Sequence, residues 1–572
     1  MIDSFRPRAL LVALLVIALA AGMAVRLGYL QVEDRQFLQR QGDARTIRME
    51  RINAHRGVMQ DRHGKPLAIS TPVLSLWANP GEVLAAQHST KQDSASTLSP
   101  NKSSPSKPDL APLADYLGVT TDDFLARMAK AGKRSFVYVR RHLPPAEARR
   151  ILSLAIPGIY AEREYRRYYP AGEVASHLVG FTDIDDRGQE GLELAFDAWL
   201  AGTPGKKKVV KNLHGEIIRD PVPVQEAVPG KNLRLAVDFR LQYLAYRELK
   251  SAVTHYKANA GSCVIVDVAT GQVLAMVNQP SYNPNNRTGL NMAALRNRAL
   301  TDAFEPGSTV KPFTAAVALG TNNYTPETII DTSPGALQVG SFVVEDPRNR
   351  GVMTLEQVIA HSSQVGISKL ALELDEYEVW KLFRSLGFGQ ETGLTFPGES
   401  LGYLPQRRRW SDIDRVTLAY GYGLAATPVQ LASAYLTIAS GGMRRELSLL
   451  SARTGEATQV LPPHLAQQLK LMLAKVVQEG TGRKAAIPGY QIAGKTGTVR
   501  KLGEGGYRDN EHLAFFAGMA PLDNPRLVAV VLIDEPKTIQ SGGGAVAAPV
   551  FSRVMSAALR ILNVIPTRIG AA

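Results

Sequence analysis

Cysteine is nearly absent from this chain of 572 residues. The single residue, Cys263, excludes an internal disulfide and cannot by itself build a metal site. It lies in the apolar run GSCVIVDV, where we expect a small buried hydrophobic side chain. The sequence also lacks a zinc-ligand spacing, an RNA-binding signature and a long basic helix, so its formal charge of +14 does not indicate a nucleic-acid partner. That charge suits an acidic membrane surface or an anionic polymer instead.

Internal repeats are lacking too, and a chain of this length exceeds what one hydrophobic core supports. We therefore expect at least two domains. A polar, mixed module is predicted for residues 31–230, and a second domain with more regular strand and helix patterns for residues 231–572. Residues 87–109 are rich in Ser, Pro and Lys without apolar periodicity, which predicts a disordered surface insertion.

One long uncharged run, Ala9 to Val25, lies near the N-terminus and continues with few charges to Leu30. That length approaches the roughly 20 residues of a membrane-spanning helix. Arg6 and Arg8 precede the run, which predicts a cytoplasmic tail at residues 1–8 and an outward-facing remainder. A cleaved signal peptide is the alternative, because ALAAGMA offers a small-x-small site. We expect an uncleaved anchor at residues 9–30.

A serine and a lysine three positions apart stand in AFEPGSTVKPF, residues 303–313. Pro306 and Gly307 end the preceding segment and allow a helix to start, so Ser308 and Lys311 would share one helix face. Pro312 fits the first turn of that helix, where its missing N–H costs nothing. A serine at a helix start is also an ordinary N-cap, and the pair alone does not indicate catalysis.

Two later segments carry similar polar groups. HSSQVG (361–366) closes a predicted helix, where Ser362 and Gln364 would otherwise be read as simple polar termination. AGKTGT (493–498) lies in a predicted strand, and a glycine inside a strand indicates either a bulge or a close backbone approach. An edge strand of this kind can bind an extended peptide, with a lysine and threonine hydroxyls available to a carboxylate.

The order Ser-x-x-Lys, Ser-x-amide, Lys-Thr-Gly is far more specific than any one of its parts, and it resembles the penicillin-binding proteins and serine β-lactamases. RGVMQDRHGKPLA (56–68), YYPAGEVASHLVGFTD (168–183) and GQEGLELAFD (188–197) look like the N-terminal module of class B penicillin-binding proteins. LAVDFRLQ and GYGLAATPVQLASAY look like their transpeptidase domain. The resemblance is strongest to the septal, penicillin-binding protein 3 type.

The resemblance implies an α+β fold with a single N-terminal transmembrane helix. An elongated, mostly-β pedestal or dimerisation-like module would follow, and then a transpeptidase domain. That domain would contain an antiparallel five-stranded sheet flanked by helices and a helical subdomain. Also implied are a location in the bacterial inner membrane, with the catalytic domain in the periplasm, and a reaction that uses neither cofactor nor metal.

The activity implied is a peptidoglycan D,D-transpeptidase that cross-links stem peptides during septum synthesis and is acylated by β-lactams. The implied partners are stem peptides, the membrane, a glycosyltransferase of the division machinery and other division proteins. Three rivals stay open. They are an elongation-type class B transpeptidase, a D,D-carboxypeptidase or β-lactamase, and a membrane-bound β-lactam sensor or scaffold. Hydrolysis would need a water-activating carboxylate, and no motif clearly supplies one.

The resemblance also implies roles for individual residues. The nucleophile would be Ser308, its base Lys311, and the group relaying a proton to the departing D-alanine Ser362. A desolvated, neutral lysine can act as such a base, and a second cation nearby would lower its pKa further. Where relatives carry Asn, this chain has Gln364, which keeps the amide and adds one methylene. The expected substrate-binding residues are Gln364, Lys495, Thr496, Gly497 and Thr498.

Overall fold

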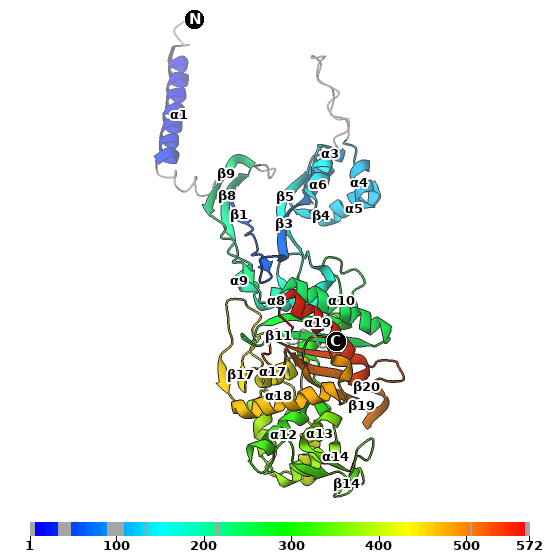
Figure 1. Ribbon diagram of the computed structural model, residues 1–572. Coiled ribbons are helices and arrows are strands. Elements are labelled where there is room, and N and C mark those ends of the chain that lie inside the picture. Colours follow the sequence, from blue (N-terminus) through cyan, green and yellow to red (C-terminus); the bar gives the residue numbers. More distant parts are fainter. Residues whose placement is uncertain are drawn as a thin grey trace. The chain divides into compact units, whose positions relative to one another are not determined.

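A computed structural model of the chain describes residues 6–32, 47–88, 108–132, 134–211, 217–503 and 506–566 (Figure 1). Two compact units are interleaved along the sequence. The first contains Met1–His55, Pro72–Arg166 and Gly202–Gly230, and the second contains Arg56–Thr71, Arg167–Ala201 and Lys231–Ala572. The sequence predicts a boundary at residue 230 between a polar module and a second domain, and this boundary stays a prediction. Residues 89–107, which are most of the disordered insertion predicted for 87–109, lie outside the described residues. Residues 87 and 88, the first two of that insertion, end helix α3 (Pro80–His88).

The first unit begins with helix α1 (Arg6–Val32). Its stretch Leu10–Leu30 has a mean hydropathy of 2.5, and none of it is buried against other parts of the protein. A helix whose apolar side chains are exposed all round is unfavourable in water and suits a lipid environment. The helix is therefore a candidate membrane span, in the place where the sequence predicted one.

The rest of the first unit contains strands of two sheets and four helices. One sheet is antiparallel with the strand order β1-β8-β9. The other is five-stranded, with the order β10-β2-β3-β4 and β5 also paired to β3, and its strands β2 (Met59–Gln60), β10 (Leu233–Arg234) and the start of β3 belong to the second unit. Helices α3 to α6 pack against the second sheet around a core that includes Leu76, Phe124 and Ile151. The bounds are β1 (Ile47–Ile52), β3 (Pro66–Ala78), α3 (Pro80–His88), α4 (Ala111–Leu117), α5 (Thr121–Ala131), β4 (Val137–Leu143), α6 (Pro145–Leu152), β5 (Ile159–Tyr168), β8 (Gly205–Lys211) and β9 (Ile217–Gln225).

The second unit contains an antiparallel five-stranded sheet of order β12-β11-β21-β20-β19. Its strands are β11 (Ala260–Asp267), β12 (Val273–Gln279), β19 (Ala493–Gly503), β20 (Gly506–Ala520) and β21 (Leu527–Asp534). Successive side chains of β11 enter different cores: Cys263 and Ile265 join one, Val264 and Val266 the other. Both faces of the sheet are thus covered, which explains a continuous apolar run where a half-exposed strand would alternate. Cys263 is a fully buried free thiol, as expected.

Helices cover the two faces of this sheet (Figure 1). On one face lie α10 (Phe239–His255) and α19 (Gly543–Ile561), and on the other α17 (Pro428–Ala439) and α18 (Pro463–Gln478). Although α19 is apolar enough to cross a membrane, half of it is buried in the core. A group of further helices lies between β12 and β19 in the sequence and corresponds to the predicted helical subdomain. They are α12 (Lys311–Gly320), α13 (Leu355–His361), α14 (Gln364–Glu373), α15 (Glu378–Ser385) and α16 (Asp412–Tyr420).

Short elements complete the second unit. They are β2 (Met59–Gln60), α7 (Ser176–Val179), β6 (Phe181–Thr182), β7 (Gly188–Glu190), α8 (Gly191–Ala195), α9 (Asp197–Leu200), β10 (Leu233–Arg234), α11 (Arg298–Thr301), β13 (Ile329–Asp331), β14 (Ala336–Val339), β15 (Phe342–Glu345), β16 (Val352–Thr354), β17 (Met443–Arg445) and β18 (Ala457–Gln459). Four further turns of 3₁₀ helix are η1 (Gly172–Val174), η2 (Met292–Ala294), η3 (Gly307–Val310) and η4 (Arg483–Ala485).

The sequence patterns predict three elements whose ends differ in the structure. Helical spacing predicts a last helix over 549–563, but α19 begins at Gly543, so Pro549 lies inside it. Helical spacing also predicts one helix over 191–202, but the chain breaks at Phe196 into α8 and α9. The alternation in NLRLAVD (232–238) predicts a strand, of which only the two residues of β10 pair with β2. The helix and strand preferences of neighbouring residues do not show where an element loses its packing partners. The ends of predicted elements are therefore the least reliable part of the prediction.

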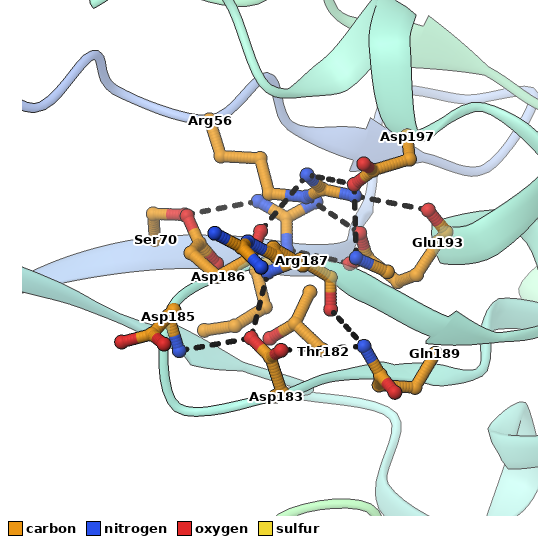
Figure 2. Close-up of polar contacts among 12 residues, drawn as sticks. Arg56, Ser70, Thr182, Asp183, Asp185, Asp186, Arg187, Gln189, Glu193 and Asp197 are labelled. Carbon is orange, nitrogen blue, oxygen red and sulfur yellow. Dashed lines mark hydrogen bonds and ion pairs between the residues drawn. The ribbon is translucent and has the colours of Figure 1, made fainter.

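A buried ion-pair network joins distant segments of the second unit (Figure 2). The guanidinium of Arg56, which has no exposed surface, donates to Glu193 Oε2 and Asp197 Oδ1, both at 2.7 Å. Glu193 Oε1 accepts from Arg167 Nε at 2.6 Å. One fully buried carboxylate thus forms ion pairs with two buried guanidinium groups. The ion pair between Arg56 and Glu193 links segments that are more than 130 residues apart in the sequence.

Removing that carboxylate should be costly. We expect Glu193→Ala to lower the free energy of unfolding by about 3–5 kcal/mol, because two buried cations lose a charged partner. Lys475→Ala, which removes one member of the exposed pair Lys475–Glu479, should cause no measurable change. Denaturant unfolding of the three proteins measures the difference. Equal midpoints for Glu193→Ala and the wild type would contradict this account.

Candidate active site

Ser308 lies in the 3₁₀ turn η3, which leads directly into α12. It is not the N-cap that the sequence offered as a possibility, because Val310 occupies that position. The turn is held by a hydrogen bond from Gly307 N to Gly421 O, 2.9 Å long. A Cβ on Gly421, whose φ is +95°, would lie 2.1 Å from Gly307 O. Only glycine allows this approach, so residue 421 helps to fix the segment that carries the serine.

The strand β19 packs against the same turn. A Cβ on Gly307, whose φ is +49°, would lie 2.5 Å from Val499 Cγ2. Val499 directly follows the Lys-Thr-Gly-Thr sequence of β19. The turn that carries Ser308 and this strand are therefore in direct contact, although nearly 190 residues separate them in the sequence.

Lys311 has no exposed surface. Its Nζ donates to Ser362 O at 2.6 Å and lies 3.3 Å from Ser362 Oγ. Burial lowers the pKa of Lys311 to about 7, and the negative charge of Asp346 opposes that shift. Much of the amine is consequently unprotonated near neutral pH. Within the described residues its hydrogen bonds go to Ser362 and none goes to Ser308, whose side chain is half-buried.

Ser362 follows α13 in a left-handed conformation, with a φ of +63°. This conformation ends the helix and directs both the carbonyl and the hydroxyl to Lys311. The next residue, Ser363, caps α14 by accepting from Gly366 N at 2.9 Å. The two serines of HSSQVG thus have different roles, one against the lysine and one as a helix cap.

Asp346 holds the same turn from the other side. Its Oδ1 accepts from the backbone N–H of Gln364 at 2.5 Å, and Ser363 Oγ donates to its Oδ2. A carboxylate at a helix N-terminus is favoured by the helix dipole. The side chain of Gln364 is half-buried and has no hydrogen bond within the described part of the chain.

Lys495 is also fully buried, and its Nζ donates to Thr496 O at 3.2 Å. Burial lowers the pKa of Lys495 well below its ordinary value, and the neighbouring Lys311 lowers it further. The prediction from the sequence was the reverse influence, in which a nearby cation, here Lys495, would lower the pKa of Lys311. Burial accounts for the shift at Lys311, so a second cation is not required there.

The remaining predicted residues lie along β19, which is an edge strand as the peptide-binding hypothesis requires. A Cβ on Gly497 would lie 1.9 Å from Phe515 Cε2, so packing inside the sheet already requires glycine. Thr496 Oγ1 lies 2.7 Å from Thr481 Oγ1. The hydroxyl oxygen of Thr498 accepts from Gly543 N at 2.9 Å.

Three residues that contact the site were not predicted from the sequence: Asp346, Thr481 and Gly543. Each stands in a loop or at a helix end without a motif of its own, and only the folded chain brings it to the site. Within the described residues, no group of three or more His, Cys, Asp or Glu side chains could hold a metal ion.

Comparison with known proteins gives the family. The penicillin-binding protein transpeptidase domain matches residues 261–556, and the penicillin-binding protein dimerisation domain matches residues 51–235. The peptidoglycan D,D-transpeptidase FtsI of Escherichia coli K12 is 41% identical over 562 residues, which cover 98% of this chain and 92% of that protein. The chain belongs to the penicillin-binding protein transpeptidase family. It is an FtsI-like peptidoglycan D,D-transpeptidase of class B, with the serine chemistry of this family.

Other relatives agree with this assignment. The probable peptidoglycan D,D-transpeptidase PbpC of Pseudomonas aeruginosa is 38% identical, covering 98% of this chain and 96% of that protein. The transpeptidase domain of penicillin-binding protein 3 from Burkholderia pseudomallei has a TM-score of 0.54 at 38% identity and covers 59% of this chain and 98% of its own. Penicillin-binding protein 3 of Mycobacterium tuberculosis, solved with aztreonam, has a TM-score of 0.68 at 26% identity, covering 91% and 100%.

The buried lysine predicts a pH dependence. If Lys311 acts as the base, penicillin acylation should slow below pH 7, by about tenfold per pH unit well below the pKa, because the amine becomes protonated. Asp346→Asn removes a charge that favours the ammonium, so the acid limb should move to lower pH. Glu345→Gln, which changes an exposed neighbour, should leave the limb in place. Second-order acylation rates from pH 5 to 9 measure it. A limb at the same pH in Asp346→Asn would contradict the assignment.

Proposed function

We propose that Ser308 is the acylated nucleophile and Lys311 its general base. The observation that carries this proposal is a fully buried amine, with a pKa of about 7, one helical turn from a serine and hydrogen-bonded to Ser362. A neutral amine can accept the serine proton, whereas an ammonium cannot. Ser308 Oγ then attacks the carbonyl that joins the two terminal D-alanines of a stem peptide. The proton passes to Lys311 as the new C–O bond forms.

The tetrahedral intermediate needs donors for its oxyanion. By the family pattern, these are the backbone N–H groups of Ser308 and Thr498, and one such donor contributes about 3–4 kcal/mol in other enzymes. Collapse of the intermediate breaks the peptide bond. The proton held by Lys311 reaches the nitrogen of the departing D-alanine through Ser362. The hydroxyl oxygen of Ser362 lies 3.3 Å from Lys311 Nζ.

A neighbouring stem peptide completes the reaction. Its amine attacks the acyl-enzyme carbonyl and loses a proton to the lysine. The bond between that carbonyl and Ser308 Oγ then breaks, and the lysine returns the proton to Oγ, which leaves a cross-link and the free enzyme. β-Lactams would stop at the acyl stage because their leaving group stays attached. The substrate-binding residues in this proposal are Gln364, Lys495, Thr496, Gly497 and Thr498.

A septal role is supported by the 41% identity with FtsI over nearly the whole chain. An elongation-type transpeptidase would have the same chemistry, so localisation of a fluorescent fusion to the septum or the side wall separates the two. A D,D-carboxypeptidase would release free tetrapeptide instead of cross-linked dimer. We also propose that a glycosyltransferase and other division proteins are partners, since cross-linking requires newly made glycan strands.

Loss of the nucleophile or its base tests the mechanism. Ser308→Ala should gain no adduct mass with penicillin, and Lys311→Ala should acylate at least 100-fold more slowly, within the range of about 10²–10⁴ for general-base catalysis. Ser153→Ala is a useful control, because it removes an exposed hydroxyl that donates to Arg150 O and does not contact the lysine, and it should acylate like the wild type. Mass spectrometry and stopped-flow labelling measure both effects. An adduct on Ser308→Ala would disprove the assignment.

We further propose that α1 spans the inner membrane once, with residues 1–8 in the cytoplasm and the catalytic domain in the periplasm. A reporter fused after Ala572 should therefore be active only outside the cytoplasm, and the intact chain should fractionate with membranes. Removal of α1 with the residues up to about 40 should release a soluble protein that still binds penicillin. A mature N-terminus near Met23 would show that the segment is a cleaved signal peptide.

A further inference from the structure

Thr481, in the loop after α18, lies beside the strand of the Lys-Thr-Gly-Thr sequence. Its Oγ1 is 2.7 Å from Thr496 Oγ1, and its backbone N–H donates to Ala360 O at 3.2 Å. Ala360 stands two residues before Ser362, at the end of α13. One residue thus contacts both the strand expected to bind substrate and the helix that ends at the relay serine.

Glycines on each side fix the backbone at this position. A Cβ on Gly480 would lie 2.1 Å from Ala360 O, and one on Gly544 would lie 2.3 Å from Thr481 O. Side chains other than hydrogen at these two positions would push Thr481 away from α13 and from α19. The close approach therefore depends on glycine at both places, and it leaves the backbone of Thr481 little freedom to move.

The hydroxyl groups in and beside β19 can donate more hydrogen bonds than they form within the described residues. The pair Thr481 and Thr496 has two hydroxyl protons, and their mutual hydrogen bond uses one. The oxygen of Thr498 accepts from Gly543 N, so its own proton is also available. Within the described residues, no other acceptor takes these two protons. When Thr481 donates the shared hydrogen bond, the free protons belong to Thr496 and Thr498, which flank Gly497 in the strand. Such protons suit an acceptor-only ligand such as a carboxylate.

We propose that Thr481 is a positioning residue for carboxylate recognition, acting through the hydroxyl of Thr496. The proposal rests on the function given above, in which residues of this strand bind the substrate, and it assigns their hydroxyl groups to the terminal carboxylate of a stem peptide or a β-lactam. Thr496 is 7% exposed and can rotate about its side-chain bond, whereas Thr481 holds that hydroxyl in one orientation. A preorganised donor binds an anion better than one that must first be ordered.

The test separates the carboxylate from the rest of the ligand. Thr481→Val keeps the shape of the side chain and removes the hydroxyl, and Thr481 is exposed, so the fold should tolerate the change. Acylation by a penicillin with its free carboxylate should slow by about 10- to 150-fold, the range expected for one hydrogen bond to a charged group. Acylation by the methyl ester of the same penicillin should change by less than about twofold.

Two further variants complete the design. Thr481→Ser should restore most of the rate with the free acid, because it returns the hydroxyl. Thr254→Val, which makes the same change at an exposed position on α10, should not affect either ligand. Unchanged rates in Thr481→Val, or equal losses with acid and ester, would overturn the proposal. Failure of the wild type to label Ser308 would instead refute the proposed function, so the two failures are distinguishable.

Discussion

Two lysine side chains, Lys311 and Lys495, are buried at one site, and the chemistry depends on the cost of charging them there. An ammonium removed from water loses its hydration, and two buried ammonium groups also repel each other. The folded protein therefore favours unprotonated amines, with the pKa of Lys311 near 7 and that of Lys495 well below its ordinary value. A lysine on the surface would stay charged at the same pH and could not take the proton of a serine.

Such burial is tolerated because each amine finds acceptors and the surrounding backbone is fixed. Ser362 O and Thr496 O supply the acceptors. Gly307 and Gly421 allow the serine turn to approach β19 and the loop after α16. The three motif-bearing segments are thus pressed together by packing, and a single enlarged side chain at either glycine would separate them.

The sequence alone indicated which motif residues belong to the candidate site better than it indicated how the folded chain arranges other residues around them. The order of the three motifs indicated the candidate residues, the glycine inside a strand indicated an edge position for β19, and the family resemblance implied the five-stranded sheet. The sequence could not indicate Asp346 or Thr481, whose side chains reach the site through loops with no local pattern. Nor did it show that Gly497 accommodates the ring of Phe515, because cross-strand packing depends on a residue eighteen positions away.

Position 364, where the family resemblance implies Asn and this chain has Gln, shows that the backbone and the side chain of one residue have separate roles here. The backbone N–H of Gln364 is held by Asp346, and the neighbouring hydroxyl of Ser363 donates to the same carboxylate. Neither bond involves the Gln364 side chain, so the turn beside Lys311 is built in the same way with either amide. The extra methylene consequently alters only what the amide can reach. A difference from the relatives' residue at this position should therefore appear in ligand preference and leave the basicity of Lys311 unaffected.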